Sequence, residues 1–194
     1  MKPAVLLTSL SMGGLAAAQQ VQSKPFKLIV QSEDKELNGR AFNLCHEGAA
    51  IESVCLYKDS SAIFHLNTTQ GAQPGPGGLA GYLTSDVPAK PPIPSSMIFY
   101  TEPSTNVAIA FFYPGSGPTQ LVGFDEQEHM NVVTTLDDTT SPPNDSTPRV
   151  LKNWYVCTTH YTSYTYKNTL NWVMGNAMPQ NPSCVKVDVK RKFV

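Results

Sequence analysis

The sequence is poor in charge and lacks long apolar runs, closely paired cysteines and any excess of positive residues. No segment reaches the about 20 apolar residues that a bilayer-spanning helix needs, which excludes such a helix. The 14 Lys and Arg are balanced by 15 Asp and Glu, so the formal net charge is −1 and the positive field of a nucleic-acid-binding protein is missing. The sequence contains no Cys-x-x-Cys pair, which is the spacing that would indicate a zinc site. We therefore expect no nucleic acid partner, no membrane span, no metal and no cofactor.

The N-terminal residues 1–18 have the pattern of a cleaved signal peptide. Lys2 gives a short basic start, and residues 4–15 are mostly apolar. Residues 16–18 are alanines, which have the small side chains that signal peptidase requires before its cleavage site. Cleavage before Gln19 would leave residues 19–194 as the mature protein, with a formal net charge of −2 once Lys2 is lost. The pattern predicts a secreted protein, located outside the cell or in the cell wall.

The mature chain is predicted to form a single all-β domain. Its length suits one domain with a substantial core, and no segment keeps a helical period. Short segments with alternating, β-branched or aromatic character occur throughout, separated by 16 prolines and several glycine-rich turns. The predicted strands cover residues 26–31, 41–45, 53–57, 62–67, 80–84, 97–101, 107–113, 119–124, 130–136, 154–159, 169–174 and 185–189. About twelve strands fit a β-trefoil-like barrel or a β-sandwich.

All four cysteines lie in the mature part, and an even number in an exported chain predicts two disulfides. Three pairings are possible. We favour the bonds Cys45–Cys55 and Cys157–Cys184. Each bond would join cysteines that are neighbours in the sequence, and the segment between them resembles a strand, a turn and a returning strand. Between Cys45 and Cys55, residues 47–52 could instead form one helical turn. A zinc site using Cys45 and His46 is the alternative, which the oxidising compartment disfavours.

Two tripeptides match the acceptor pattern for N-glycosylation, at Asn67 and at Asn144. Asn144 lies in the segment 139–148, which is rich in Ser, Thr, Pro and Asn and should form an exposed loop. Asn67 ends an apparent strand. We therefore expect a glycoprotein in which Asn144 is the better acceptor.

Several short motifs stand out along the mature chain. They are Ser-Lys-Pro-Phe at residues 23–26, Leu-Asn-Gly at 37–39, Cys-His-Glu-Gly-Ala-Ala-Ile-Glu at 45–52, Trp-Tyr-Val-Cys at 154–157 and Asn-Pro-Ser-Cys at 181–184. With these motifs, the chain resembles a family of small secreted fungal proteins that carry a domain of unknown function. The resemblance implies export and a fungal source, and it implies no catalytic residues. More distantly, the layout of strands and cysteines is similar to that of fungal cell-wall and conidial surface proteins.

His46, Glu47 and Glu52 form one group that could carry chemistry, because a Cys45–Cys55 bond would hold them close together. A histidine beside carboxylates can act as a base or bind a metal. On a strand, however, His46 and Glu47 would point to opposite faces, and no recognisable nucleophile motif accompanies them. We therefore favour a structural role for this group.

A second acidic group follows two of the predicted strands. It consists of Asp125, Glu126 and Glu128 beside His129, and of Asp137 and Asp138. A glycosidase-like acid and base pair or a calcium site could be built from such residues. Solvated acids next to turns are ordinary, however, and the spacing lacks the glycine-centred loop of a calcium motif, so we expect neither role.

Aromatic residues are concentrated between Trp154 and Trp172. We expect the two tryptophans to fill the core beside a disulfide. Tyr161, Tyr164 and Tyr166 lie in the loop-like run 160–168, where exposure and burial are equally expected. Exposed tyrosines can stack on sugar faces, so these three are the candidate ligand-binding residues of an extracellular carbohydrate-binding surface.

These patterns predict a secreted, non-enzymatic glycoprotein that acts at the cell surface or in the wall and binds a glycan or a protein. The alternative is a small secreted hydrolase that uses His46 and nearby carboxylates. A structural wall component, retained through its attached glycans, is a third possibility.

Overall fold

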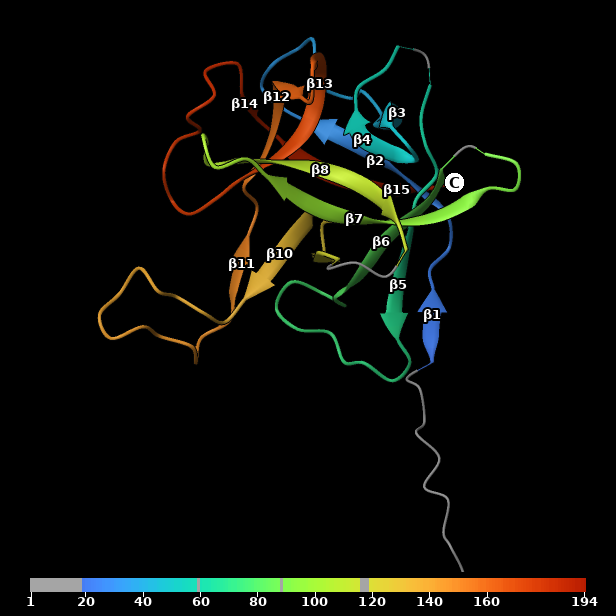
Figure 1. Cartoon of the computed structure of the whole chain (residues 1–194). Helices are drawn as coiled ribbons and strands as arrows, with labels where there is room; N and C mark the ends of the chain where they lie inside the picture. Colours follow the sequence, from blue (N-terminus) through green and yellow to red (C-terminus); the bar gives the residue numbers. More distant parts are fainter. Residues whose placement is uncertain (1–18, 59, 88, 116–118) are drawn as a thin grey trace, which may run out of the picture.

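The computed structural model describes residues 19–58, 60–87, 89–115 and 119–194, which form 15 β-strands and, over these ranges, no helix (Figure 1). The predicted signal peptide lies outside the described residues. The strands are β1 Gln20–Gln22, β2 Phe26–Gln31, β3 Asn43–Gly48, β4 Ile51–Cys55, β5 His65–Thr69, β6 Gly81–Val87, β7 Ile93–Thr101, β8 Val107–Pro114, β9 Leu121–Phe124, β10 Met130–Thr134, β11 Arg149–Leu151, β12 Trp154–Tyr161, β13 Tyr164–Val173, β14 Val185–Lys186 and β15 Asp188–Phe193. The predicted all-β class is confirmed.

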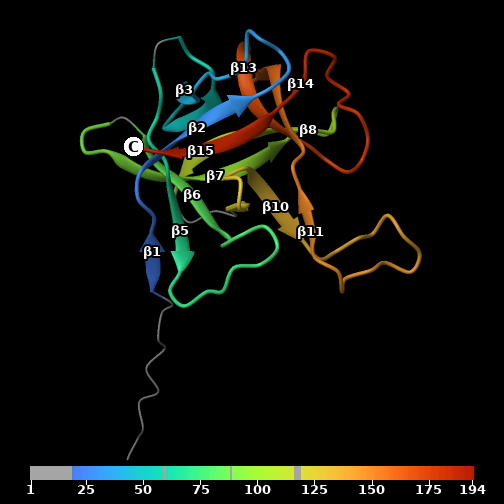
Figure 2. The same cartoon turned by 180° about the vertical axis from the view of Figure 1, so that it is seen from behind.

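Thirteen of the strands form one antiparallel sheet that curls into a half-barrel. Its main path runs β11-β10-β9-β6-β7-β8-β4-β13-β12-β14, with β5 and β1 beside β6 and β3 beside β4. The remaining two strands, β2 and β15, pair with each other and cross the hollow side of the sheet, as Figure 2 shows. The half-barrel therefore has an inner face covered by this two-stranded ribbon and an outer face on the other side.

The core lies between the inner face and the ribbon. Phe26, Leu28 and Val30 alternate along β2 with partly exposed residues, and all three are fully buried. Trp154 is also fully buried, and its indole N–H donates a 2.8 Å hydrogen bond to the Met130 carbonyl. Each such side chain contributes about 1.5–3 kcal/mol by leaving water. Because Trp172, at 5% exposure, packs against Trp154, the expected core role of both tryptophans is confirmed.

The two disulfides are Cys45–Cys55 and Cys157–Cys184, with Cα–Cα separations of 6.0 and 4.1 Å. Both favoured pairings are confirmed. The first bond joins β3 to its neighbour β4, and the second joins β12 to the segment that leads into β14. No helical turn forms between Cys45 and Cys55, because the chain reverses there in a tight hairpin in which Ala50 has a φ of 61°.

Three segments differ from the sequence-based prediction. The short strands β1 and β11 were not predicted, and each becomes a strand through its pairing with a longer neighbour. The run 160–168, expected to be loop-like, mostly extends β12 and β13 into a long hairpin that reverses at Thr162, where φ is 54°.

The C-terminal strand ends beside the start of β2, whereas β1 lies apart from it, beside β5 (Figure 1). Phe26 in β2 is directly opposite Phe193 in β15, and the Val194 N–H donates a 3.2 Å hydrogen bond to the Pro25 carbonyl. Arg191 lies over the rings of Phe124 and Phe193 and bonds to Glu128. Arg191 is thus held by packing and by an ion pair. No helix that could cross a membrane occurs among the residues the structure describes.

Candidate outer-face groove

The outer face of the half-barrel carries an aromatic cluster. Residues directly opposite each other in neighbouring strands share a face, so the strand register defines which side chains lie there. From β7 across β8 to β4 and β13, the outer-face pairs are Ser96 with Tyr113, Ile98 with Phe111, Phe111 with Ser53, Tyr100 with Ile109, and Ile109 with Asn171. The inner-face partners, such as Met97 and Phe112, belong to the core.

The tip of the β12–β13 hairpin folds over this face. A β-bulge between Cys157 and Thr159 bends the hairpin. As a result, the Tyr161 ring meets Phe111 and Tyr100 edge-on, with ring centroids 4.8 and 5.1 Å apart. These contacts connect the hairpin tip to β7 and β8, and they leave a hollow beside Tyr161.

This hollow, here called the Tyr161 groove, has a volume of about 700 Å³. Hydroxyl and amide side chains make up much of its lining, namely Ser104, Thr105, Thr159, Thr162, Gln180 and Asn181. Tyr100, Tyr161 and His160 add rings, and Glu102 adds a carboxylate that accepts a 2.9 Å hydrogen bond from the Tyr100 hydroxyl. That bond raises the pKa of Tyr100 above its ordinary value. The groove therefore combines aromatic walls with many hydrogen-bonding groups.

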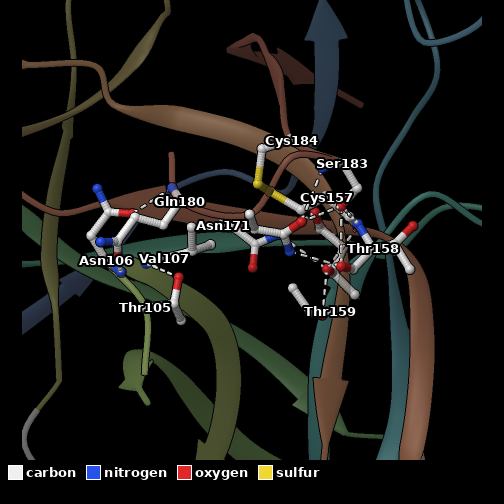
Figure 3. The surroundings of a disulfide bond; sticks show 12 residues. Thr105, Asn106, Val107, Cys157, Thr158, Thr159, Asn171, Gln180, Ser183 and Cys184 are labelled. Atoms are coloured by element: carbon white, nitrogen blue, oxygen red, sulfur yellow. Dashed lines mark hydrogen bonds between the residues drawn. A yellow bond between two sulfur atoms is a disulfide. The ribbon is translucent and has the colours of Figure 1, made fainter. Parts of the chain in front are cut away.

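One rim of the groove is fastened to the sheet by hydrogen bonds and by a disulfide (Figure 3). The Asn106 N–H donates to the Gln180 side-chain oxygen at 2.8 Å, and the Gln180 N–H donates to the Asn106 side-chain oxygen at 2.9 Å. The Cys157–Cys184 bond then fixes the chain that follows Gln180 to β12. The rim therefore keeps its position without any ligand.

Beneath the groove lies a chain of buried polar groups. The hydroxyls of Thr159 and Thr169 are 2.9 Å apart, and the Asn171 amide donates to the Thr169 carbonyl and hydroxyl at 2.7 and 3.0 Å. Thr169 and Asn171 are fully buried, which makes such bonds strong and their loss costly. This layer supports the floor of the groove.

The three tyrosines selected from the sequence lie close together, although on strands and a hairpin tip rather than in a loop. Tyr164 is directly opposite Tyr161 and is 66% exposed. Tyr166 is opposite Thr159 and its ring centroid is 6.5 Å from that of Tyr164. Tyr100, Phe111 and Glu102 complete the cluster from β7, β8 and their turn. Sequence analysis missed these three, because they are far from the tyrosines along the chain.

Glu47 is a buried carboxyl on the same face. It is 7% exposed, and the hydroxyls of Ser53 and Tyr166 face it. Burial raises the pKa of Glu47 more than these two hydroxyls lower it. Burial, together with the neighbouring Glu47, raises the pKa of Tyr166 to about 12. Glu47 therefore favours its neutral form more than an exposed glutamate does.

The group His46, Glu47 and Glu52 is divided between the two faces of the sheet. His46 Nδ1 lies 3.0 Å from Glu52 Oε1, and Glu52 is opposite the core residue Phe112. Glu47 lies in the β-bulge of β3 and points to the outer face beside Ser53 and Tyr166. The structure thus brings His46 to Glu52 and keeps Glu47 away from that pair.

Three members of the second acidic group are paired with basic residues. Asp125 lies 2.6 Å from the Lys152 ammonium, Glu128 lies 2.5 Å from Arg191, and Asp137 lies 2.8 Å from Arg149. Burial raises the pKa of Asp125, but Lys152 and the His129 N–H lower it more, so it lies below its ordinary value. The described residues contain no group of three or more His, Cys, Asp or Glu side chains arranged to hold a metal ion.

The two predicted glycosylation sites lie in different surroundings. Asn144 is exposed, and its side-chain oxygen accepts hydrogen bonds from the N–H and hydroxyl of Ser146 at 3.0 and 2.8 Å. Asn67 lies within β5, between Gln22 of β1 and Tyr82 of β6, and its side-chain oxygen is buried. Once the chain has folded, the glycosylation enzymes can therefore reach Asn144 more easily than Asn67.

The fold and the groove together describe a small disulfide-bonded β domain with a polar and aromatic surface groove. Residues 23–193 match the family described as Domain of unknown function (DUF7907), which spans nearly all of the described chain. The protein belongs to this family. No curated protein and no solved structure matches it.

Proposed function

We propose that this protein is a secreted, non-enzymatic glycoprotein of the cell surface or wall that binds carbohydrate in the Tyr161 groove. The observation that carries this proposal is that Tyr161 forms a wall of a groove lined by hydroxyl and amide side chains, with the exposed Tyr164 opposite it in the hairpin. Sugar rings present apolar faces that stack on aromatic rings and hydroxyls that exchange hydrogen bonds with such side chains. The groove offers both kinds of contact.

The extracellular setting rests on separate arguments. Two disulfides are compatible with an extracellular protein, since such bonds persist in oxidising compartments. The pattern of residues 1–18 supports export, and the exposed acceptor tripeptide at Asn144 supports glycosylation. The fungal source and the wall location follow from the family resemblance in the sequence.

The proposal is tested by binding to insoluble wall polysaccharides and to a glycan array. Tyr164→Ala should weaken saturable binding about three- to tenfold, because it removes one stacking surface at little cost to the fold. Tyr57→Ala is the matched control, since Tyr57 is 64% exposed and lines a different hollow. Equal binding by both variants, or no binding of any glycan by the wild type, would reject the proposal.

The hydrolase alternative is favoured by one observation, the contact between His46 and Glu52. It predicts that the same polysaccharides are cut and that His46→Ala abolishes the release of soluble sugar. Our proposal expects that the wild type and His46→Ala both bind the polysaccharide and that neither releases soluble sugar.

A further inference from the structure

A second groove lies on the same sheet and is here called the Asn67 groove. Its volume is about 570 Å³, and eight of its lining residues besides Tyr82 carry amide or hydroxyl groups, among them Gln20, Gln22, Asn67, Thr84, Ser96 and Thr119. Tyr82 contributes an aromatic ring, and His65 and Asp86 are the titratable groups besides Tyr82. Its chemistry is therefore similar to that of the Tyr161 groove.

Both grooves are on the outer face. Asn67 is directly opposite Tyr82, His65 is opposite Thr84, and Thr84 is opposite Ser96. Ser96 and Tyr100 are four residues apart on β7, so both side chains point to the same face. The Asn67 groove includes Ser96 and the Tyr161 groove includes Tyr100. At about 3.3 Å per residue, the two grooves are only about 13 Å apart along this strand.

The surface between the grooves is aromatic and apolar. Ile98 lies between Ser96 and Tyr100 on the same face, and Tyr113, opposite Ser96, is 45% exposed. A polymer whose units have apolar faces and polar edges fits this arrangement. Its apolar faces can lie on the surface between the grooves, and its polar groups can form hydrogen bonds in the two grooves. The two grooves and the surface between them thus form one track along β7.

The Asn67 groove also contains an acceptor that lacks a partner. The side-chain oxygen of Asn67 is buried, and no described residue donates a hydrogen bond to it. Such an acceptor costs free energy until a donor reaches it. The rest of the Asn67 side chain lines the groove, so a ligand hydroxyl there contacts the amide group, and it reaches the buried oxygen only if the amide turns toward the groove.

The charge of the track limits the ligand. No lysine or arginine lines either groove in the part of the chain that the structure describes. The carboxyl groups that line the grooves belong to Asp86 and Glu102, and the buried Glu47 lies on the same face. An acidic polysaccharide would meet repulsion without compensation, whereas a neutral one would not.

We infer that a single extended chain of a neutral polysaccharide occupies both grooves and lies along β7 between them. This inference rests on the proposed function and adds to it the length and the charge class of the ligand. Long oligosaccharides fill both grooves and contact the Asn67 side chain. Short ones fill the Tyr161 groove alone.

The test uses neutral β-linked gluco-oligosaccharides and chito-oligosaccharides, from disaccharide to octasaccharide, in titrations with the secreted, disulfide-intact protein. Affinity should rise with length by about tenfold once the chain reaches the second groove. Asn67→Ala should remove this gain and leave the affinity for short oligosaccharides unchanged. Because Asn67→Ala deletes a buried acceptor without a partner, it should not destabilise the fold.

Controls separate this inference from the proposed function and from glycosylation. Thr69→Ala destroys the acceptor tripeptide but keeps the Asn67 side chain, so it should preserve the gain with length. A second variant, Ser96→Trp, fills the groove and should also remove the gain. Affinity that is independent of length, or a length gain that survives both Asn67→Ala and Ser96→Trp, would overturn the inference while the proposed function stands. A glycan attached to Asn67 would also overturn it, and no binding at any length would reject the proposed function.

Discussion

Tyr161 meets Phe111 edge-on, with ring centroids 4.8 Å apart and ring planes at 74°. This contact joins the tip of the β12–β13 hairpin to the middle of β8 across the outer face. Because Phe111 is only 2% exposed, Tyr161 serves both as part of its cover and as a wall of the groove. Packing and ligand contact therefore have to be separated by experiment at this position.

The first prediction concerns this separation. Phe111→Ala should lower the free energy of unfolding by about 3–5 kcal/mol, because it removes a buried ring and leaves a cavity. Tyr164→Ala should change it by about 0.5 kcal/mol or less, since Tyr164 is largely exposed. Denaturant unfolding measures both values. A large loss of stability in Tyr164→Ala would mean that its effect on binding comes from the fold.

The second prediction concerns pH. Burial holds the pKa of Glu47 above the ordinary 4.5, so the folded state keeps the proton better than the unfolded state does. The associated stability is fully present below the unfolded pKa and is lost as the pH rises through the folded pKa. Glu47→Gln should therefore gain stability relative to wild type from pH 4.5 upward. Unfolding titrations over this range measure the difference, and parallel curves would contradict it.

The third prediction concerns Asp125 and Lys152. The pKa of Asp125 is lowered, so its contribution to stability is present above the unfolded pKa and is lost as the pH falls through the folded pKa. Lys152→Met should lower the free energy of unfolding at neutral pH by about 1–2 kcal/mol, because it leaves the partly buried carboxylate without its cation. It should also raise the pKa of Asp125 in an NMR titration. Lys192→Met, at an exposed position, is the control.

The fourth prediction concerns the disulfide at the rim. The double variant Cys157→Ala with Cys184→Ala should lose about 3 kcal/mol of stability, since the bond closes a loop with a sequence separation of 27. It should also weaken glycan binding, because the segment carrying Gln180 would no longer be fixed to β12. Thermal unfolding and the glycan titration measure the two effects. Unchanged affinity in the folded variant would show that the rim does not contact the ligand.

The fifth prediction concerns Asn144. The secreted protein should carry an N-glycan there, and Asn144→Gln should remove its mass without changing the free energy of unfolding, because the side chain is exposed. Mass spectrometry of the intact protein and of its peptides checks this. An unmodified Asn144 in secreted protein would remove it from the expected acceptor sites.

Local patterns predicted much of the fold. The alternation of Phe26, Leu28 and Val30 indicated a half-buried strand, and the spacing of the cysteines indicated both disulfides. The two strands of the β12–β13 hairpin were predicted, but their extension to the tip at Tyr161 was missed, because Thr, Ser, Lys and Asn weaken the strand pattern there. The contact of Tyr161 with Phe111 spans 50 positions of the sequence. Strand alternation predicted that His46 and Glu47 point to opposite faces, whereas no local pattern marks the β-bulge at Glu47.

The pairing of β2 with β15 also determines how the domain can be attached to a surface. Since β15 crosses the hollow side of the half-barrel, a tether attached to the C-terminus leaves from the side opposite the outer face. The outer face then stays open to a ligand when the domain is anchored at this end. A tether attached at Gln19 would instead leave beside β5 and the Asn67 groove, which Gln20 and Gln22 line.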